Sequence, residues 1–187
     1  MKILLIVGPS GSGKDTLIRS ARQYFIEAGQ LGFVRRYITR PPDHHEDNFY
    51  VDESGFQLLD RARFFVATWQ AHANMYGVPR SELMRSHGLQ RAPVKLCSVS
   101  RTAVGDFERE FPDTTTIEVT ADKSVLAARL SGRGRETAEA IGKRLARADL
   151  KTRARRLITF DNSGNLEESR TRFIRLLEQL TGESSDE

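Results

Sequence analysis

The sequence is poor in the residues that build disulfides and membrane spans. It has one cysteine, Cys97, among 187 residues, which excludes a disulfide within the chain. No apolar run approaches the roughly 20 residues that cross a bilayer, and the apolar start at 3–7 is too short for a signal peptide. These absences predict one soluble domain without a membrane partner, in a reducing compartment, the cytoplasm.

The chain also has little net charge, +4, and no run of basic residues interleaved with aromatic ones. A nucleic-acid partner is therefore not expected. Arginine nevertheless makes up 23 of the 29 basic residues. Its planar fork suits bidentate contacts with phosphate, although a general preference for arginine explains the same composition. Composition leaves open whether the chain is a monomer or a homodimer.

Strand and helix patterns alternate along the chain. Apolar, strand-like runs lie at 3–7, 31–38, 93–99, 115–119 and 156–160. Helical patterns lie between and after them, at 17–28, 102–110, 123–130, 137–155 and 166–180, with a polar tail at 182–187. This alternation predicts a single α/β domain with a parallel sheet flanked by helices, and ligands bound beyond the carboxyl ends of the strands.

Two segments interrupt the alternation. Residues 40–80 mix aromatic and polar residues after a Pro-Pro break, and residues 131–136 read Ser-Gly-Arg-Gly-Arg-Glu. We expect the first segment to be an acceptor-binding insertion and the second to begin a lid over the active site, at about 131–140.

A glycine-rich motif lies between the first predicted strand and the first predicted helix. It matches G-x-x-x-x-G-K-[ST] at all but one position. In that pattern glycines let backbone amides wrap nucleotide phosphates, and a lysine reaches the outer ones. A glycine-rich turn without a ligand is the alternative, and the lysine argues against it. The predicted nucleotide-binding residues are Gly8, Pro9, Ser10, Gly11, Ser12, Gly13, Lys14, Asp15 and Thr16.

Asp15 is the mismatch, because a serine or threonine hydroxyl at that position usually coordinates Mg²⁺. A carboxylate there can ligate Mg²⁺ or hold one of its waters. Alternatively, Asp15 only complements the positive end of the helix dipole. Thr16 is rotated about 100° around the helix, so it is not a simple replacement.

Arginines and a tyrosine near the two insertions suit phosphoryl transfer, which needs mainly positioning and positive charge. Arg133, Arg135 and Arg144 are candidates for closing over the transferred group, with a solvated basic helix end as the alternative. Arg36, Arg40 and Tyr76 are candidates for holding an acceptor phosphate, although a strand-end arginine is often only exposed.

In order along nearly the whole chain, the motifs resemble those of guanylate kinases: the glycine-rich loop, Thr39-Arg40, Tyr76-Gly77, Arg133-Gly134-x-Glu136 and Ile141-x-x-Arg144-Leu145. That resemblance implies a P-loop NTPase fold of guanylate-kinase type. The departures concern the guanine site. Ala67 stands where that family has a glutamate that reads guanine, and residues 98–101 lack its acidic residues. GMP is therefore a poor candidate acceptor.

Asp15, the run Arg-Tyr-Ile-Thr-Arg at 36–40 and Ser100-Arg101 are features that plain guanylate kinases lack. In these features the chain more closely resembles the ribose 1,5-bisphosphate phosphokinase family of phosphonate metabolism. The resemblance implies transfer of the γ-phosphoryl group from Mg-ATP to ribose 1,5-bisphosphate, which gives 5-phosphoribosyl 1-diphosphate (PRPP). It adds His72, Ser100 and Arg101 to the acceptor side. The alternatives are a structural role for His72, and for Arg101 a helix cap or a pair with a helix carboxylate. A nucleoside monophosphate or another phosphorylated sugar is the alternative acceptor, and a phosphopeptide-binding module is the alternative without catalysis.

Two further polar groups have competing interpretations. Asn162, in the turn after the last predicted strand, either lines the adenine pocket or forms an Asx turn. The run His-His-Glu-Asp at 44–47 is interpreted as a solvated loop, because adjacent histidines point in different directions and no further ligand pair follows. Trp69 and the pair Phe64-Phe65 are interpreted as core residues and not as a platform for a base.

Overall fold

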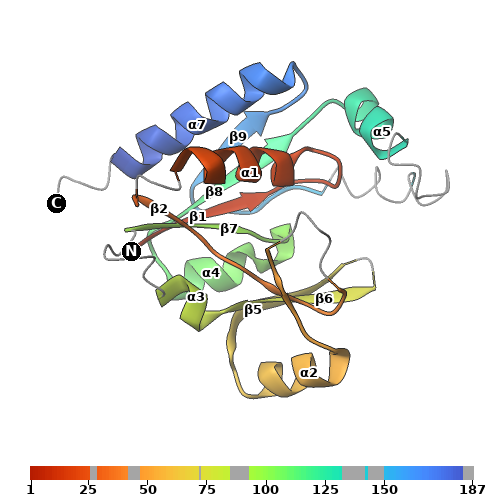
Figure 1. Ribbon diagram of the computed structural model, residues 1–187, viewed down its shortest axis with the longest axis vertical. Helices are drawn as coiled ribbons and strands as arrows, with labels where there is room; N and C mark the ends of the chain where they lie inside the picture. The colour runs from red at the N-terminus through yellow and green to blue at the C-terminus, as the bar shows by residue number, and fades with distance from the viewer. Residues whose placement is uncertain are drawn as a thin grey trace.

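The computed structural model describes residues 1–25, 29–41, 47–71, 73–84, 93–131, 142 and 150–182. Strands and helices alternate in this part of the chain, as Figure 1 shows. Their order is β1 (Lys2–Val7), α1 (Lys14–Phe25), β2 (Leu31–Phe33), β3 (Tyr37–Ile38), β4 (Phe49–Tyr50), α2 (Glu53–Arg61), β5 (Phe65–Ala71), β6 (Asn74–Pro79), α3 (Arg80–Met84), β7 (Val94–Ser98), the 3₁₀ helix η1 (Arg101–Ala103), α4 (Val104–Glu110), β8 (Thr114–Thr120), α5 (Lys123–Ser131), β9 (Leu157–Asp161) and α7 (Leu166–Gly182).

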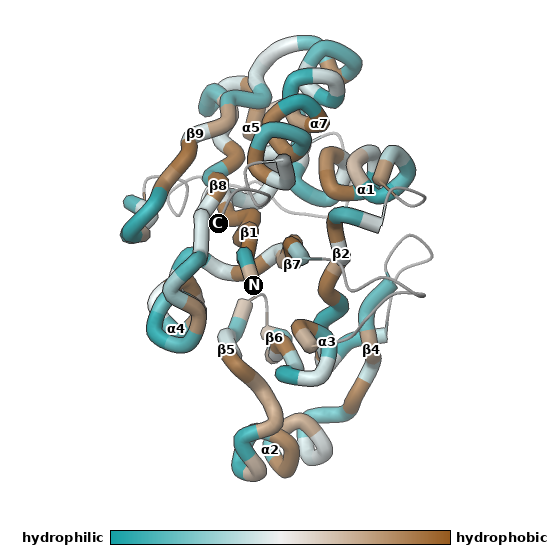
Figure 2. Tube along the Cα trace, turned by 90° about the vertical axis from the view of Figure 1, so that its left-hand side faces the viewer, coloured by the Kyte–Doolittle hydropathy of each residue, from teal (hydrophilic) through white to brown (hydrophobic). Residues whose placement is uncertain are grey.

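The main sheet has five parallel strands in the order β2-β7-β1-β8-β9. Its central strand β1 is apolar at five successive positions, and all five side chains are fully buried. A parallel sheet is covered on both faces, so its strands are continuous apolar runs and do not alternate. Figure 2 shows hydrophobic residues along the length of β1 and β2.

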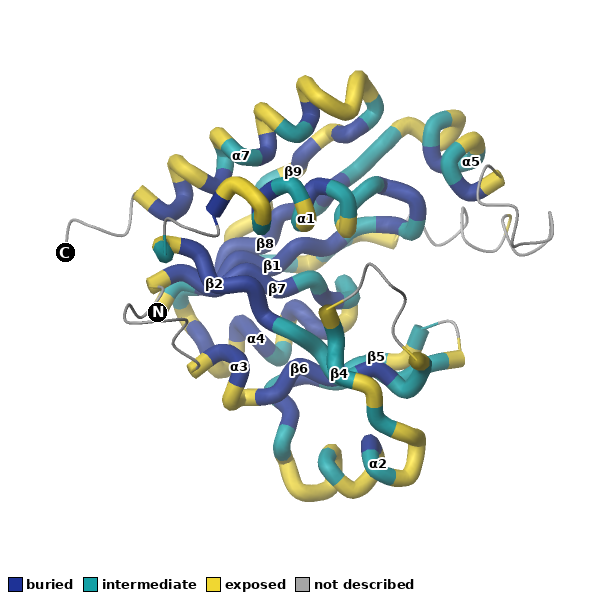
Figure 3. Tube along the Cα trace, in the orientation of Figure 1, coloured by how far each residue is buried: buried dark blue, intermediate teal, exposed yellow. Residues whose placement is uncertain are grey.

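Helices cover both faces of this sheet, which confirms the predicted fold class. Leu4 and Ile6 of β1 pack with buried residues of α1 and α7. Ile3, Leu5 and Val7 point to the opposite face and pack with α4. Successive side chains of a strand alternate between faces, so one apolar strand supplies both cores. Figure 3 shows four strands of the main sheet, β2, β7, β1 and β8, as mostly buried, whereas the edge strand β9 is mostly exposed.

A second, four-stranded sheet occupies most of the segment predicted to bind an acceptor. Its order is β4-β3-β6-β5, with β5 and β6 antiparallel and β3 parallel to β4. β5 packs against α4 and η1, so this sheet lies beside the carboxyl end of β7. Gly77 of β6 is required there, because a Cβ atom would lie 2.7 Å from the ring of Phe65.

The expectation of one strand over 31–38 is wrong. The chain leaves the main sheet after Phe33 and enters the second sheet at Tyr37. Between them, Arg35 and Arg36 bond to Glu82 and to the Ser98 carbonyl, neither of which is a ladder partner.

The expected helix at 137–155 is wrong at its end. Residues 150–154 have no regular structure, and their polar groups bond to Arg101 and Glu118 instead. The rest of this segment, apart from residue 142, lies outside the described residues.

The remaining helices are close to expectation. α1 begins three residues before the predicted start, at Lys14, and the segment 102–110 divides into η1 and α4. Within the described ranges, no helix is long and apolar enough to cross a membrane.

Candidate active site

The glycine-rich loop joins β1 to α1 at the carboxyl edge of the main sheet. Gly8, Gly11 and Gly13 all have positive φ values, which L side chains rarely adopt. A Cβ atom on Gly8 would lie 2.2 Å from the Val119 carbonyl oxygen of β8. The loop therefore folds tightly against the sheet at the start of α1, where the unpaired amides of a helix N-terminus favour phosphate binding.

Lys14 turns back over this loop. Its Nζ atom donates to the carbonyl oxygens of Gly8 and Pro9, both at 2.8 Å, and lies 3.5 Å from the Ser12 hydroxyl. These contacts hold the ammonium group within the loop that the sequence predicts to bind phosphates. Lys14 is thus in position to neutralise an anion bound to the loop amides.

Asn162 anchors the loop from the opposite side. It is almost fully buried, and its Nδ2 atom donates to the Ser12 carbonyl oxygen at 2.7 Å. Its Oδ1 atom is buried without a hydrogen-bond partner in the described part of the chain. The alternative interpretation of Asn162 as an Asx-turn residue is wrong. The adjacent Asp161 makes that turn by accepting from the Ser163 amide at 3.2 Å and hydroxyl at 2.6 Å.

Sequence reasoning missed Arg129, the arginine of α5 that reaches the loop. Its Nη2 atom donates to the Asn162 carbonyl at 2.9 Å. Its Nη1 atom is buried with no partner among the residues described, 3.7 Å from where a Cβ on Gly13 would be. The available signal was its place one helical turn before Arg133.

Asp15 lies exposed in the first turn of α1, with Thr16 beside it. No group of three or more metal-ligating side chains occurs in the described ranges. Mg²⁺ in phosphoryl-transfer sites usually takes one or two protein oxygens, together with substrate phosphates and water. The Asp15 carboxylate fits that donor set. The interpretation of Asp15 as a metal ligand stays a prediction.

Arg36 and Tyr76, both predicted for the acceptor side, come together. The Arg36 Nη1 atom donates to the Ser98 carbonyl at 3.1 Å, at the carboxyl end of β7. Its guanidinium carbon lies 6.0 Å from the centre of the Tyr76 ring. That ring is parallel to Trp69, with 5.5 Å between centroids. Arg36 therefore bridges the two sheets beside an aromatic pair.

Three other residues predicted for the acceptor side are engaged elsewhere. The Arg40 Nη1 atom donates to the Pro41 carbonyl at 3.2 Å, and Ser100 caps η1 by accepting from the Thr102 amide. Arg101 forms an ion pair with Glu118 at 3.8 Å and donates to the Leu150 carbonyl. Burial lowers the pKa of Arg101, and Glu118 opposes that effect.

The position of the missing guanine-reading glutamate is part of the core. Ala67 is 4% exposed and belongs to the apolar cluster shared with α4. Of the residues interpreted as core, Phe65 is buried, whereas Phe64 and Trp69 are half-buried. The second sheet therefore presents a cation and aromatic rings near β7, with no carboxylate at the place that Ala67 occupies.

Several predicted positions lie outside the described residues. They are His72 on the acceptor side, the lid arginines Arg133, Arg135 and Arg144, and the run 44–46. The lid segment 131–140 is described only at Ser131, the last residue of α5. Their assigned roles stay predictions.

Comparison with known proteins gives consistent results. No model of a protein family matches the chain. The ribose 1,5-bisphosphate phosphokinase PhnN of Rhizobium etli is 39% identical over 183 residues, which cover 97% of this chain and 91% of the relative. The protein of the same name from Acidiphilium cryptum is 45% identical over 147 residues, covering 79% and 77%. That from Agrobacterium fabrum is 35% identical, covering 97% and 99%. A crystal structure of guanylate kinase from Anaplasma phagocytophilum superposes with a TM-score of 0.59 at 19% identity, over 96% of this chain and 86% of that one, which supports the fold alone.

Proposed function

Because the chain belongs to the ribose 1,5-bisphosphate phosphokinase family, we propose that it transfers the γ-phosphoryl group of ATP to ribose 1,5-bisphosphate. The product is 5-phosphoribosyl 1-diphosphate. An oxygen of the phosphate on C1 attacks the γ-phosphorus, and the bond from that phosphorus to the β,γ-bridging oxygen breaks. ADP leaves with the bridging oxygen.

One observation supports this acceptor over a nucleotide: the acceptor side presents Arg36 and an aromatic pair, while Ala67 is buried in the core. A site that selects guanine needs polar groups matched to the edge of the base, and a site without them loses that selectivity. A bisphosphate needs positive charge instead, which the guanidinium group supplies bidentately.

The chemistry does not require a general base. The acceptor oxygen belongs to a phosphate that is already ionised at neutral pH, so catalysis consists of alignment and charge neutralisation. Lys14 supplies charge at the loop, and Arg129 directs its buried Nη1 atom to the same place. We infer that Arg133, Arg135 and Arg144 add charge from the lid.

We infer that Asn162 lines the adenine pocket of the donor site. The unpartnered Oδ1 atom of Asn162 is suited to accept a hydrogen bond from the amino group of adenine. Asp15 would hold Mg²⁺, which neutralises charge on the phosphate oxygens when bound.

A coupled assay of ADP release tests the proposal with ribose 1,5-bisphosphate and GMP as competing acceptors. We expect turnover of the sugar and none of GMP. Lys14→Met should abolish turnover, whereas Arg80→Gln should not, because the exposed Arg80 pairs only with Glu110 among the described residues. Turnover of GMP without turnover of the sugar would refute the assignment, and absence of turnover with both would favour a binding module.

A further inference from the structure

The connection between the two sheets contains an ion pair in which the carboxylate is buried and the guanidinium group is half-buried. Glu82 of α3 is 5% exposed, and its carboxylate accepts three hydrogen bonds from Arg35. The donors are the Arg35 amide at 3.3 Å, Nε at 3.2 Å and Nη2 at 3.1 Å. One carboxylate therefore holds both the backbone and the side chain of a residue that belongs to neither sheet.

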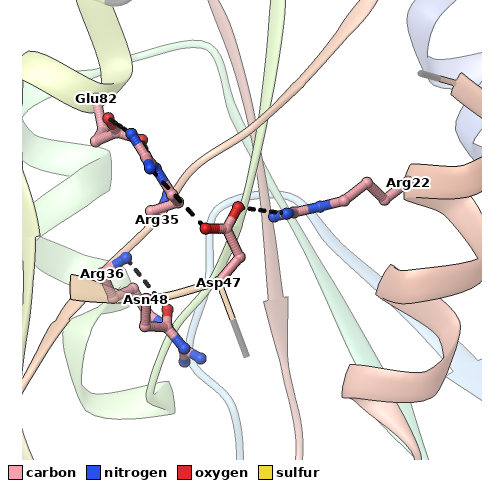
Figure 4. Close-up of polar contacts among 6 residues, drawn as sticks. All are labelled: Arg22, Arg35, Arg36, Asp47, Asn48 and Glu82. Atoms are coloured by element: carbon pink, nitrogen blue, oxygen red, sulfur yellow. Dashed lines mark hydrogen bonds and ion pairs between the residues drawn. The ribbon is translucent and has the colours of Figure 1, made fainter. Parts of the chain in front are cut away.

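Two further groups contact the Arg35 side chain, and Figure 4 shows one of them, Asp47, between Arg35 and Arg22. Its guanidinium carbon lies 4.2 Å from the centre of the Phe49 ring in β4. Asp47 approaches its Nη1 atom to 3.9 Å, and the other Asp47 oxygen pairs at 2.7 Å with Arg22 of α1. The hydrogen bond to Glu82 raises the pKa of Arg35. The Arg35 side chain is thereby restricted to one direction.

The next residue, Arg36, is fixed from the other side of the backbone. Its amide donates to the Asn48 Oδ1 atom at 3.3 Å, and its carbonyl accepts from the Phe49 amide at 2.8 Å. Its guanidinium group then extends to Ser98 and Tyr76. The two adjacent arginines thus diverge, one into the pair with Glu82 and one toward the acceptor side.

An ion pair that buries a carboxylate is poor evidence for added stability, because the cost of desolvation offsets the attraction between the charges. It does specify geometry, since a bidentate guanidinium–carboxylate pair tolerates few orientations. We propose that the Glu82–Arg35 pair positions Arg36, so that both are positioning residues of the acceptor site. This inference rests on the proposed acceptor role of Arg36.

The test is a double-mutant cycle between Glu82→Gln and Arg36→Ala, with ATP and ribose 1,5-bisphosphate as substrates. Glutamine keeps the size of the side chain but loses the charge and one acceptor oxygen. We expect Glu82→Gln to raise KM for the acceptor about tenfold while KM for ATP stays within about twofold. Added to Arg36→Ala, it should change acceptor KM no further, since a positioning residue acts only through the residue it positions.

Asp47→Asn is the matched control. It removes the exposed neighbour of Arg35 and leaves the pair with Glu82, so acceptor KM should stay within about twofold of wild type. If Glu82→Gln does not fold, Arg35→Lys replaces it in the cycle, because lysine cannot reproduce the bidentate pair. Additive effects on acceptor KM, or equal changes in KM for both substrates, would overturn the proposal.

Failure of the proposed function gives a different result. A wild-type protein that phosphorylates GMP and not ribose 1,5-bisphosphate refutes the acceptor assignment. The same cycle measured with GMP then still decides whether Glu82 acts through Arg36.

Discussion

Asn162→Ala is predicted to weaken ATP binding far more than it destabilises the fold. Asn162 joins the turn after β9 to the phosphate loop through one hydrogen bond, from its Nδ2 atom to the Ser12 carbonyl at 2.7 Å. The substitution removes this anchor, and the loop backbone from Ser12 to Gly13 loses its support from β9.

The expected change in stability is small because two effects oppose each other. The hydrogen bond contributes about 0.5–1.5 kcal/mol, and leaving the buried Ser12 carbonyl unpaired costs about 1–3 kcal/mol. Alanine also removes the buried Oδ1 atom, which has no partner among the described residues. Its removal relieves a desolvation penalty of about 1–3 kcal/mol in the wild-type fold, and this gain offsets the cost of the unpaired carbonyl. The net loss is about 1 kcal/mol, which lowers Tm by about 2–4 °C in a chain of this length.

Calorimetry of ATP binding and thermal unfolding measures both quantities. We expect Kd for ATP to rise about tenfold, which corresponds to about 1.4 kcal/mol. Asp161→Asn is the control, since it alters the exposed neighbour in the same turn and leaves the loop contact in place. Unchanged ATP affinity in Asn162→Ala would refute the reasoning, and so would a fall in Tm of more than about 10 °C.

Two further predictions concern titrating groups. Burial raises the pKa of the Cys97 thiol to about 12, so at pH 8 only about one thiol in ten thousand is ionised. Ellman's reagent should therefore react with Cys97 in denaturant and not in the native protein, and rapid native labelling would contradict the burial. At the start of α2, hydrogen bonds from the Gly55 amide and the Ser54 hydroxyl lower the pKa of Asp52 below 3.8. The ionised carboxylate then stabilises the fold above about pH 4 and loses this effect as pH falls through the lowered value. The urea midpoint of Asp52→Asn should lie below that of wild type at pH 7 and equal it in strong acid. The same difference in urea midpoint at both pH values would contradict a stabilising role for the ionised Asp52 carboxylate.

Local patterns were sufficient to predict the glycine-rich loop, because its requirements lie within nine consecutive residues. The central strand was predictable for a similar reason, since a fully apolar run of five residues suits only a strand covered on both faces. The same criterion failed at 31–38. That run is apolar enough for one strand, but whether Arg35 continues the ladder depends on Glu82, which lies 47 residues further along the chain.

In the candidate site, too, some contacts could be predicted from the sequence and others could not. Arg36 and Tyr76 were predicted together and are together, whereas Arg101 was predicted for the acceptor side and pairs with Glu118. Arg129 was overlooked because its spacing from Arg133 is a weak signal that does not show what its guanidinium group contacts. Only the position of α5 beside the loop brings its guanidinium group to Asn162.

The sequence by itself determined the loop, its glycines and Lys14, and the apolar strands that place the loop at one edge of a parallel sheet. Backbone conformation and burial of short segments depend on neighbouring residues, which a sequence displays directly. The tertiary structure decided which side chains act together, because Asn162 meets Ser12 across 150 residues. Such pairs depend on how elements pack, and the same arginine can meet a carboxylate or a substrate according to that packing.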